Sequence, residues 1–230
     1  MTYYPVFLDL RDREVVVVGG GTVAERKVRA LLEAGARVRV VSRTFVPSLK
    51  ALAECGRIAF RAGEFEEADL EGAWLIISAT DDAEVNRRVA EAAARHRRFC
   101  NVADAPAFCS FLAPAVIRRG AVAIAISTGG QSPALAVHLK QKIAAIIGPE
   151  YGALAELLSH MRPLVQERIP DPKWRAEVFH RLVESEVFDL LRAGERSAAE
   201  AHARALIERW ASESSWSEDL RDIASGGDAL

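Results

Sequence analysis

Cysteines are few in this sequence, and long apolar runs are absent. The 230 residues include three cysteines, an odd number without the Cys-x-x-Cys spacing of zinc or redox sites, so neither a disulfide framework nor a metal site is predicted. No run of about 18 or more apolar residues occurs, and the first residues show no basic segment followed by an apolar one. Neither a membrane span nor a signal peptide is therefore predicted. We therefore expect a cytoplasmic protein that binds no membrane.

An excess of charge of either sign is also lacking. The formal net charge is −2, which provides no general attraction to nucleic acid or to a membrane surface. The chain is 50% hydrophobic and 27% charged, as is typical of globular proteins, and it is long enough for one large domain or two small ones. We expect no nucleic-acid partner, and any affinity for an anionic substrate must come from local basic clusters.

The most informative stretch covers residues 14–27. Four valines in a row predict a buried strand that leads directly into a glycine triplet, and a helical pattern follows. With Ala24 in the last position, this is the G-x-G-x-x-(G/A) pattern in its strand–turn–helix setting, which predicts a dinucleotide site. Gly19 can adopt a backbone conformation that a Cβ would penalise, Gly21 lets the pyrophosphate approach, and the first N–H groups of the helix bind it. The alternative is a tight turn without a ligand. The candidate cofactor-binding residues here are Gly19, Gly20, Gly21, Thr22 and Val23.

Strands and helices then alternate roughly every 20 residues, which predicts an α/β fold with a Rossmann-like, doubly wound parallel sheet. The predicted strands are residues 14–18, 37–41, 57–61, 73–79 and 99–102. Such sheets bind ligands at the carboxyl ends of their strands. The further cofactor-binding candidates are therefore Ser42, Arg43 and Thr44 after the second strand, with Thr80 and Asp81 after the fourth.

The end of the second strand normally distinguishes NAD from NADP. A carboxylate there hydrogen-bonds the ribose of NAD, whereas an arginine accommodates the 2′-phosphate of NADP. The sequence has Ser42 and Arg43 at this place and no carboxylate, which leans slightly toward NADP or toward no preference. The alternative is that Arg43 is a solvated surface residue.

Asp104 follows the fifth predicted strand, in the segment Asn-Val-Ala-Asp-Ala-Pro. A carboxylate at this place could accept a proton from a substrate while the nicotinamide accepts a hydride. Equally, it could be a turn aspartate that hydrogen-bonds its own backbone before Pro106. The residues alone favour neither interpretation.

The pattern changes after residue 110. Two apolar runs, 111–117 and 121–127, are separated only by Arg118, Arg119 and Gly120, which indicates a hairpin. A second glycine loop follows at 128–133 and leads into a helix that ends near residue 148. This loop is either a second anion pocket or a plain capped turn. The substrate-binding candidates are Ser127, Thr128, Gly129, Gly130 and Ser132 in the loop, with Arg118, Arg119 and Lys140 as cations for carboxylates, although solvated surface charges are the default for these three.

The remainder of the chain is helical in pattern. Apolar residues recur at helical spacing over residues 151–168, 174–191 and 197–210, with breaks at 169–172 and 193–196. Residues after 211 are rich in Ser, Asp, Glu and Gly and predict a disordered tail.

Several of these motifs occur together in one known family. They are Val-Gly-Gly-Gly-Thr-Val-Ala-Glu-Arg-Lys at 18–27, Ala-Thr-Asp-Asp at 79–82, Cys-Asn-Val-Ala-Asp-Ala-Pro at 100–106 and Ile-Ser-Thr-Gly-Gly-Gln-Ser-Pro at 126–133. In this order they resemble the precorrin-2 dehydrogenase/sirohydrochlorin ferrochelatase family, the N-terminal module of siroheme synthases. Specific motifs cover residues 1 to about 150. The helical remainder is similar only in general character.

The resemblance implies an NAD-dependent oxidation of precorrin-2 to sirohydrochlorin, with Fe²⁺ as a second substrate in bifunctional members that also insert iron to give siroheme. It implies a homodimer and a tetrapyrrole substrate. Asp104 matches the family's essential aspartate, proposed there as the general base. Because only a polar tail follows residue 211, we expect a form without the methyltransferase domain of longer members.

The expected organisation is an NAD-binding domain over residues 1–112, a dimerisation segment of hairpin and helix over 113–149, a small helical domain over 150–211 and a disordered tail over 212–230. Two other functions stay open. One is a dehydrogenase without chelatase activity, and the other is a nucleotide-sensing regulatory module without turnover, which would need neither Asp104 nor the second glycine loop.

Overall fold

The computed structural model describes residues 3–212, so the predicted disordered tail lies outside the described residues except for its first residue. The chain divides into two compact units. The first contains the chain up to residue 114 together with residues 127–133, and the second contains residues 115–126 and the chain from residue 134 onward. Each unit is described by itself.

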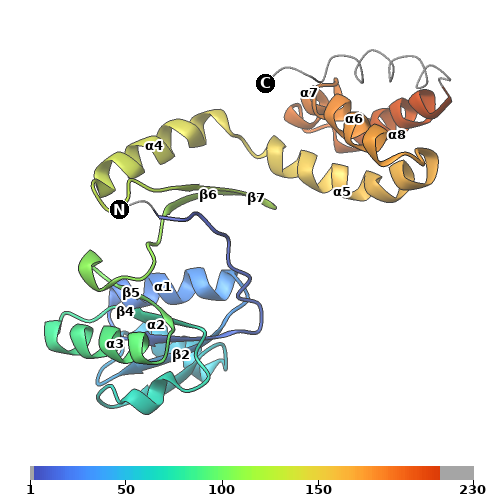
Figure 1. The fold of residues 1–230 in the computed structure, drawn as a ribbon. Coiled ribbons are helices and arrows are strands. Elements are labelled where there is room, and N and C mark those ends of the chain that lie inside the picture. The colour runs from blue at the N-terminus through green and yellow to red at the C-terminus, as the bar shows by residue number, and fades with distance from the viewer. Residues whose placement is uncertain (1–2, 213–230) are drawn as a thin grey trace. The chain divides into compact units, whose positions relative to one another are not determined.

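The first unit is built on a five-stranded parallel sheet with the strand order β3-β2-β1-β4-β5, which confirms the predicted doubly wound fold (Figure 1). The strands are β1 Glu14–Val18, β2 Arg37–Ser42, β3 Ala59–Ala62, β4 Leu75–Ser78 and β5 Phe99–Val102, and the helices are α1 Thr22–Glu33, α2 Pro47–Glu54 and α3 Ala83–Arg95, with single 3-10 turns η1 Glu67–Leu70 and η2 Pro106–Phe108. The third strand begins two residues later than predicted, at Ala59. In the register, Val18 pairs with Val41 on one side and with Ser78 on the other, so these strands end together.

The valines of β1 explain why the sheet needs helices on both faces. Val15 and Val17 pack with Val28 of α1 on one face, while Val16 and Val18 pack with Val89 of α3 on the other. Successive side chains of a strand point to opposite faces, so a run of apolar residues without alternation must be buried on both sides. Burial of each valine contributes roughly 1.5 kcal/mol or more.

The ends of the helices follow the sequence signals. Asp82 caps α3, because its Oδ1 atom accepts the N–H groups of Glu84 at 3.0 Å and Val85 at 3.1 Å. Helix α1 ends at Glu33 and is closed by Gly35, whose φ is +77°, while the N–H of Ala36 donates to the carbonyl of Leu31. Both caps are expected from the sequence, because aspartate favours the N-cap of a helix and glycine the position just after its C-terminus.

The second unit begins with an antiparallel hairpin of β6 Ala115–Arg119 and β7 Val122–Ile126, joined by a two-residue loop in which Gly120 has φ of +55°. This confirms the predicted hairpin. The helices are α4 Pro133–Ile146, α5 Glu150–Arg168, α6 Pro172–Val183, α7 Val187–Arg192 and α8 Arg196–Ser212. The last four share one core, around Met161, Val178, Leu182 and Ile207. Among the described residues, no helix is long and apolar enough to cross a membrane.

The predicted single helix over residues 174–191 is wrong, because the chain breaks between α6 and α7. Ser185 causes the break. Its hydroxyl donates to the carbonyl of Leu182 at 2.8 Å and accepts the N–H of Val187 at 3.3 Å, and such local bonds compete with helical ones. The apolar spacing continues through the break because both helices contribute to the same core, so spacing alone could not show it.

Candidate cofactor site and catalytic turn

Two glycines of the turn after β1 lie against neighbouring backbone. Gly19 has φ of +118°, as its predicted role requires, and a Cβ added to it would lie 2.3 Å from the carbonyl oxygen of Ala79. A Cβ added to Gly20 would lie 2.0 Å from the carbonyl oxygen of Thr44. The turn is therefore wedged between the ends of β2 and β4. The need for glycine at position 20 was not predicted, because its neighbour Thr44 follows the end of another strand.

Gly21, unlike Gly19 and Gly20, is not in contact with neighbouring backbone. Nothing lies within 4 Å of a Cβ added to it. It is the N-cap of α1, and no side chain caps that helix end. Thr22 and Val23 follow in the first turn and are exposed. The N–H groups at the start of a helix attract anions, so open space beside an uncapped helix fits a pyrophosphate.

A hydrogen-bond chain holds the loop after β4. The Ser78 hydroxyl donates to Oδ1 of Asn86 at 2.7 Å, and Nδ2 of Asn86 donates to the carbonyl of Thr80 at 3.0 Å. Oγ1 of Thr80 accepts the N–H of Asp82 at 3.2 Å. Asp81 lies exposed between them. This side of the candidate site is thus held rigidly before any ligand binds.

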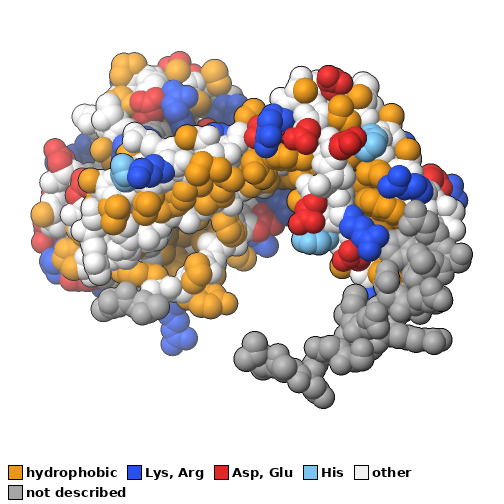
Figure 2. Space-filling model, turned by 90° about the horizontal axis from the view of Figure 1, so that it is seen from above, with side chains coloured by type: hydrophobic (Ala, Val, Ile, Leu, Met, Phe, Trp, Pro, Cys, Tyr) orange, Lys and Arg blue, Asp and Glu red, His pale blue; other side chains and the backbone are white. Residues whose placement is uncertain are grey.

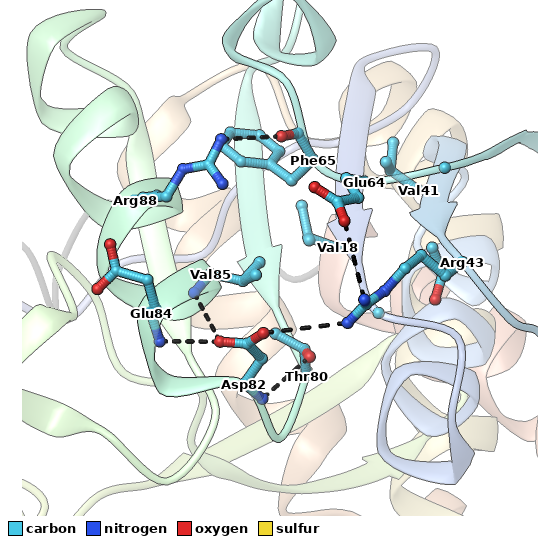
Figure 3. Close-up of a pocket in the computed structure, with 13 residues that line it drawn as sticks. Val18, Val41, Arg43, Glu64, Phe65, Thr80, Asp82, Glu84, Val85 and Arg88 are labelled. Carbon is cyan, nitrogen blue, oxygen red and sulfur yellow. Dashed lines mark hydrogen bonds and ion pairs between the residues drawn. The ribbon is translucent and has the colours of Figure 1, made fainter.

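A cavity of about 160 Å³ opens where β1, β2, β3 and β4 end (Figure 3). Gly19, Ser42, Arg43 and Thr80 line it, which brings together four of the predicted cofactor-binding residues. The guanidinium of Arg43 lies between two carboxylates, with Nη1 3.8 Å from Oε1 of Glu64 and Nη2 4.0 Å from Oδ2 of Asp82. Neither carboxylate was among the predicted cofactor-binding residues. Glu64 follows β3, and Asp82, although it follows β4, is more typical of a helix cap.

Asp104 lies in the turn after β5 in a left-handed conformation, with φ of +57°, and it is exposed. Within residues 3–212 its carboxylate makes no hydrogen bond, which does not support the alternative of a turn aspartate bonded to its own backbone. Its carboxylate interacts electrostatically with Lys27 of α1. Burial lowers the pKa of Lys27, as does Arg26, whereas Asp104 and Cys109 act in the opposite direction. Lys27 was part of a quoted motif, but no role was predicted for it.

The second glycine loop is closed by its own hydrogen bonds. Oγ1 of Thr128 donates to the carbonyl of Ser132 at 3.0 Å and accepts the N–H of Ser132 at 3.1 Å. The N–H of Gly129 donates to Oγ of Ser127, and the N–H of Gln131 donates to the carbonyl of Thr128. Gly129 and Gly130 have φ of +63° and +81°. Because these N–H groups bond within the loop, a self-contained turn is favoured over an anion pocket, and substrate binding here stays a prediction.

The three predicted cations belong to the second unit and differ in their surroundings. Arg119 donates from Nε to the carbonyl of Ile147 at 2.9 Å and from Nη2 to that of Ala144 at 3.1 Å, so its guanidinium completes the end of α4. Arg118 and Lys140 are exposed. In the part of the chain that the structure describes, no group of three or more His, Cys, Asp or Glu side chains is arranged to hold a metal ion.

Three family models match the chain one after another. The putative NAD(P)-binding model covers residues 6–115, the sirohaem biosynthesis protein central model covers 119–146, and the sirohaem synthase dimerisation region covers 150–207. The siroheme synthase of Methylococcus capsulatus is 43% identical over 208 residues, which are 90% of this chain and 43% of that protein. The chain belongs to the siroheme synthase family. The resemblance predicted from the motifs is therefore confirmed.

Further relatives of this chain are similar over most of its length. The siroheme synthase of Escherichia coli is 42% identical over 182 residues, 79% of this chain and 40% of that protein. The chain thus spans less than half the length of these curated relatives. The solved structure of SirC, precorrin-2 dehydrogenase, is 26% identical with a TM-score of 0.74, and the match covers 90% of this chain and all of that one.

The match to the putative NAD(P)-binding model includes all five strands of the sheet, in agreement with the predicted NAD cofactor. The residues present fit a dinucleotide, since the open face of Gly21 and the cavity beside Arg43 both lie where the strands end. The dimerisation region matches residues 150–207, which the sequence analysis assigned to a helical domain, whereas it assigned dimerisation to 113–149. The predicted boundaries stay predictions.

Proposed function

We propose that this chain oxidises precorrin-2 to sirohydrochlorin with NAD. The observation that carries the proposal is the exposed, unbonded carboxylate of Asp104, held at the end of β5 in the same unit as the glycine turn. The family models and the likeness to SirC support it. A regulatory module that only senses nucleotide would gain nothing from a carboxylate held in this way.

In the proposed mechanism, Gly21 and the first N–H groups of α1 hold the pyrophosphate, and the cavity beside Arg43 receives the adenosine ribose. When bound, NAD would supply the acceptor for the hydride that leaves a saturated carbon of the substrate. Asp104 accepts the accompanying proton, so the substrate loses two electrons and two hydrogens in all. Lys27 contributes a positive charge that interacts with that carboxylate.

The substrate carries many carboxylates, and we propose Arg118 and Lys140 as their contacts, because both side chains are exposed cations. Ser127, Thr128, Gly129, Gly130 and Ser132 are proposed to contact the substrate as a preformed loop. Arg119 has its main role at the end of α4.

We also propose a homodimer. Of the residues of α4, only Ala136 is buried, while Val137 is 50% exposed and Ile146 is 72% exposed. In Figure 2, which views the molecule from above, hydrophobic side chains gather in a band on this face. A helix that leaves apolar residues on its surface is typical of a surface that a partner subunit covers. The dimerisation region of the family, over residues 150–207, supports the same proposal.

Incubation of the full chain with precorrin-2 and NAD, followed by absorbance spectra, tests the dehydrogenase. Asp104→Asn is the best variant, since asparagine tolerates the left-handed conformation that alanine does not, and the amide cannot accept a proton. We expect Asp104→Asn to bind NAD normally and to lose turnover by roughly 10²-fold or more.

Asp12→Asn is the matched control. Asp12 is also exposed and also has a positive φ, +58°, but it precedes β1 and so lies at the opposite end of the strands. Unchanged turnover in Asp104→Asn would remove Asp104 from the mechanism. Addition of Fe²⁺ or Co²⁺ to the product then tests metal insertion, for which Asp104 is the candidate base that removes pyrrole protons. A spectrum that stays that of sirohydrochlorin would identify a dehydrogenase without chelatase activity.

A further inference from the structure

The cavity at the ends of β2 and β3 carries charges that discriminate between NAD and NADP. We infer that Glu64 and Asp82, which flank Arg43 at 3.8 Å and 4.0 Å, make the site selective for NAD by excluding a 2′-phosphate. This inference rests on the proposed function for the location of the dinucleotide. It differs from the expectation from Ser42 and Arg43 alone, which leaned slightly toward NADP or toward no preference.

Glu64 is held in place by its own backbone. The N–H of Gly63 donates to the carbonyl of Ser42 at 3.0 Å, which ties the loop after β3 to the end of β2. Nη2 of Arg61 donates to the carbonyl of Glu64 at 2.6 Å. Phe65, the next residue, is buried, and its carbonyl accepts from Arg88 at 3.3 Å (Figure 3). The main chain of Glu64 is thus fixed on both sides, and its carboxylate projects toward Arg43.

Asp82 is restrained in a different way. Its Oδ1 atom accepts two N–H groups at the start of α3, so the other oxygen, Oδ2, is the one that faces Arg43. Rotation of the carboxylate away from Arg43 would break the helix cap, which is worth about 1 kcal/mol. The second negative charge of the cavity is therefore as firmly placed as the first.

The charges around the cavity do not favour a second phosphate. Five charged side chains line it, but the carboxylate of Glu84 is paired with Arg87 outside the lining at 2.6 Å, and Arg88 donates to the carbonyl of Phe65. This leaves the carboxylates of Glu64 and Asp82 on either side of the Arg43 guanidinium. A phosphate monoester adds a charge of about −1.5 to −2 at neutral pH. A ribose 2′-hydroxyl, in contrast, can donate a hydrogen bond to Glu64. Selectivity then comes from repulsion of the wrong ligand as well as from attraction of the right one.

Titration calorimetry of the full chain with NAD and with NADP tests the inference. For the unaltered protein we expect NAD to bind at least about tenfold more tightly than NADP. In Glu64→Gln the ratio of the two dissociation constants is expected to shift toward NADP by about tenfold, and in Glu64→Gln combined with Asp82→Asn by more. Asparagine keeps the cap of α3, because it is as good an N-cap as aspartate.

A further variant tests whether Arg43 is the group that binds the 2′-phosphate. Once Glu64 is neutral, the Arg43 guanidinium is available to the 2′-phosphate, so Arg43→Ala in the Glu64→Gln background should abolish the gain in NADP affinity. The control is Glu71→Gln, which removes an exposed carboxylate of the same unit that does not line the cavity and should leave the ratio unchanged.

The outcomes separate this inference from the proposed function. Equal affinity of the unaltered protein for both dinucleotides, or a ratio that Glu64→Gln does not move, would overturn the inference while leaving NAD-dependent turnover of precorrin-2 intact. Binding of NAD with the expected selectivity but no turnover of precorrin-2 would support the inference and overturn the proposed substrate. Failure to bind either dinucleotide would overturn both.

Discussion

The Sγ atom of Cys109 contacts both backbone groups of Val102: the Val102 N–H donates to it at 3.2 Å, and the Val102 carbonyl oxygen lies 3.3 Å away. The carbonyl of Ala105 lies 3.5 Å from the same sulfur. Val102 and Ala105 are the two ends of the turn that carries Asp104. The thiol of Cys109 therefore closes this turn, and it does so at the place where the main chain of Asp104 is left-handed.

Cys109→Ala should loosen the Asp104 turn. The variant leaves the N–H of Val102, a residue only 2% exposed, without its sulfur partner, at a cost of about 1 kcal/mol or more. We expect kcat with precorrin-2 to fall roughly tenfold, because small displacements of a catalytic group are costly, while the Kd of NAD stays unchanged. Cys109→Ser is the matched variant, since a hydroxyl both accepts and donates, and it should restore most of the rate. A wild-type kcat in Cys109→Ala would show that the sulfur does not position Asp104.

Gly21→Asn should separate cofactor binding from stability. Nothing in the protein would contact the new Cβ, and asparagine at an N-cap accepts the N–H groups that are proposed to bind the pyrophosphate. The free energy of unfolding in urea should stay within about 0.5 kcal/mol of the wild-type value or rise. Calorimetry should show the Kd of NAD increased by at least about tenfold. Normal NAD affinity would mean that the pyrophosphate lies elsewhere.

Gly20→Ala serves as the contrasting variant. Its Cβ would lie 2.0 Å from the carbonyl oxygen of Thr44, a backbone atom that cannot rotate away. We expect a loss of about 2 kcal/mol in unfolding free energy, as for other overpacked sites. If Gly20→Ala were as stable as the wild type, the close contact between the glycine turn and the end of β2 would be incorrect.

The fold was predictable where the signals are local. The valine run, the glycine triplet and the caps at Gly35 and Asp82 each act within a few residues, and all of them appear in the structure as expected. The break at Ser185 was not predictable, because the apolar periodicity of α6 continues into α7 and only a hydroxyl marks the end. Propensity and spacing cannot detect a change of direction that keeps both helices on one core.

The candidate site also has parts that could be predicted from the sequence and parts that could not. The glycine turn and Asp104 follow directly from the ends of strands, so their place in the site could be predicted. The pairing of Arg43 with Glu64 could not, since it depends on which strand lies beside β2 and on where the following loop is tied. The role of Cys109 was hidden for a similar reason, because a cysteine gives no sequence signal for a bond to backbone groups several residues earlier.

Cys55 and Cys100 should differ strongly in reactivity. Burial, with a smaller effect of Cys109, raises the pKa of the Cys100 thiol from 9.0 to about 12, whereas Cys55 is exposed. A difference of three pKa units lowers the thiolate fraction near pH 8 by about 10³, so iodoacetamide should alkylate Cys55 readily and Cys100 only after unfolding. Peptide mass spectrometry with and without urea measures this order. Rapid alkylation of Cys100 in the native protein would contradict its burial in the core.

The buried ion pair of Arg61 and Asp69 should make part of the stability depend on pH. The Asp69 side chain is 5% exposed, and it accepts hydrogen bonds from Arg61 and, at 2.8 Å, from the N–H of Glu66. Burial alone would raise the pKa of Asp69, but the bonds from Arg61 and Glu66 outweigh it and hold the pKa below 3.8. A carboxyl whose pKa is lower in the folded protein stabilises the fold above its unfolded pKa. That contribution is lost as the pH falls through the folded value.

Asp69→Asn tests this dependence, because an amide has nearly the shape of the carboxyl group and cannot ionise. Near pH 7 the variant should lose about 2 kcal/mol of unfolding free energy, less than for a fully buried pair since Arg61 is 34% exposed. Below about pH 3.8 the difference between wild type and variant should shrink, as Asp69 becomes protonated and resembles asparagine. Urea unfolding of both proteins across this pH range measures the difference directly, so the other carboxylates that titrate there cancel. A difference that stays constant down to about pH 2 would show that the charge of Asp69 adds nothing to the stability of the loop that holds Glu64 in place.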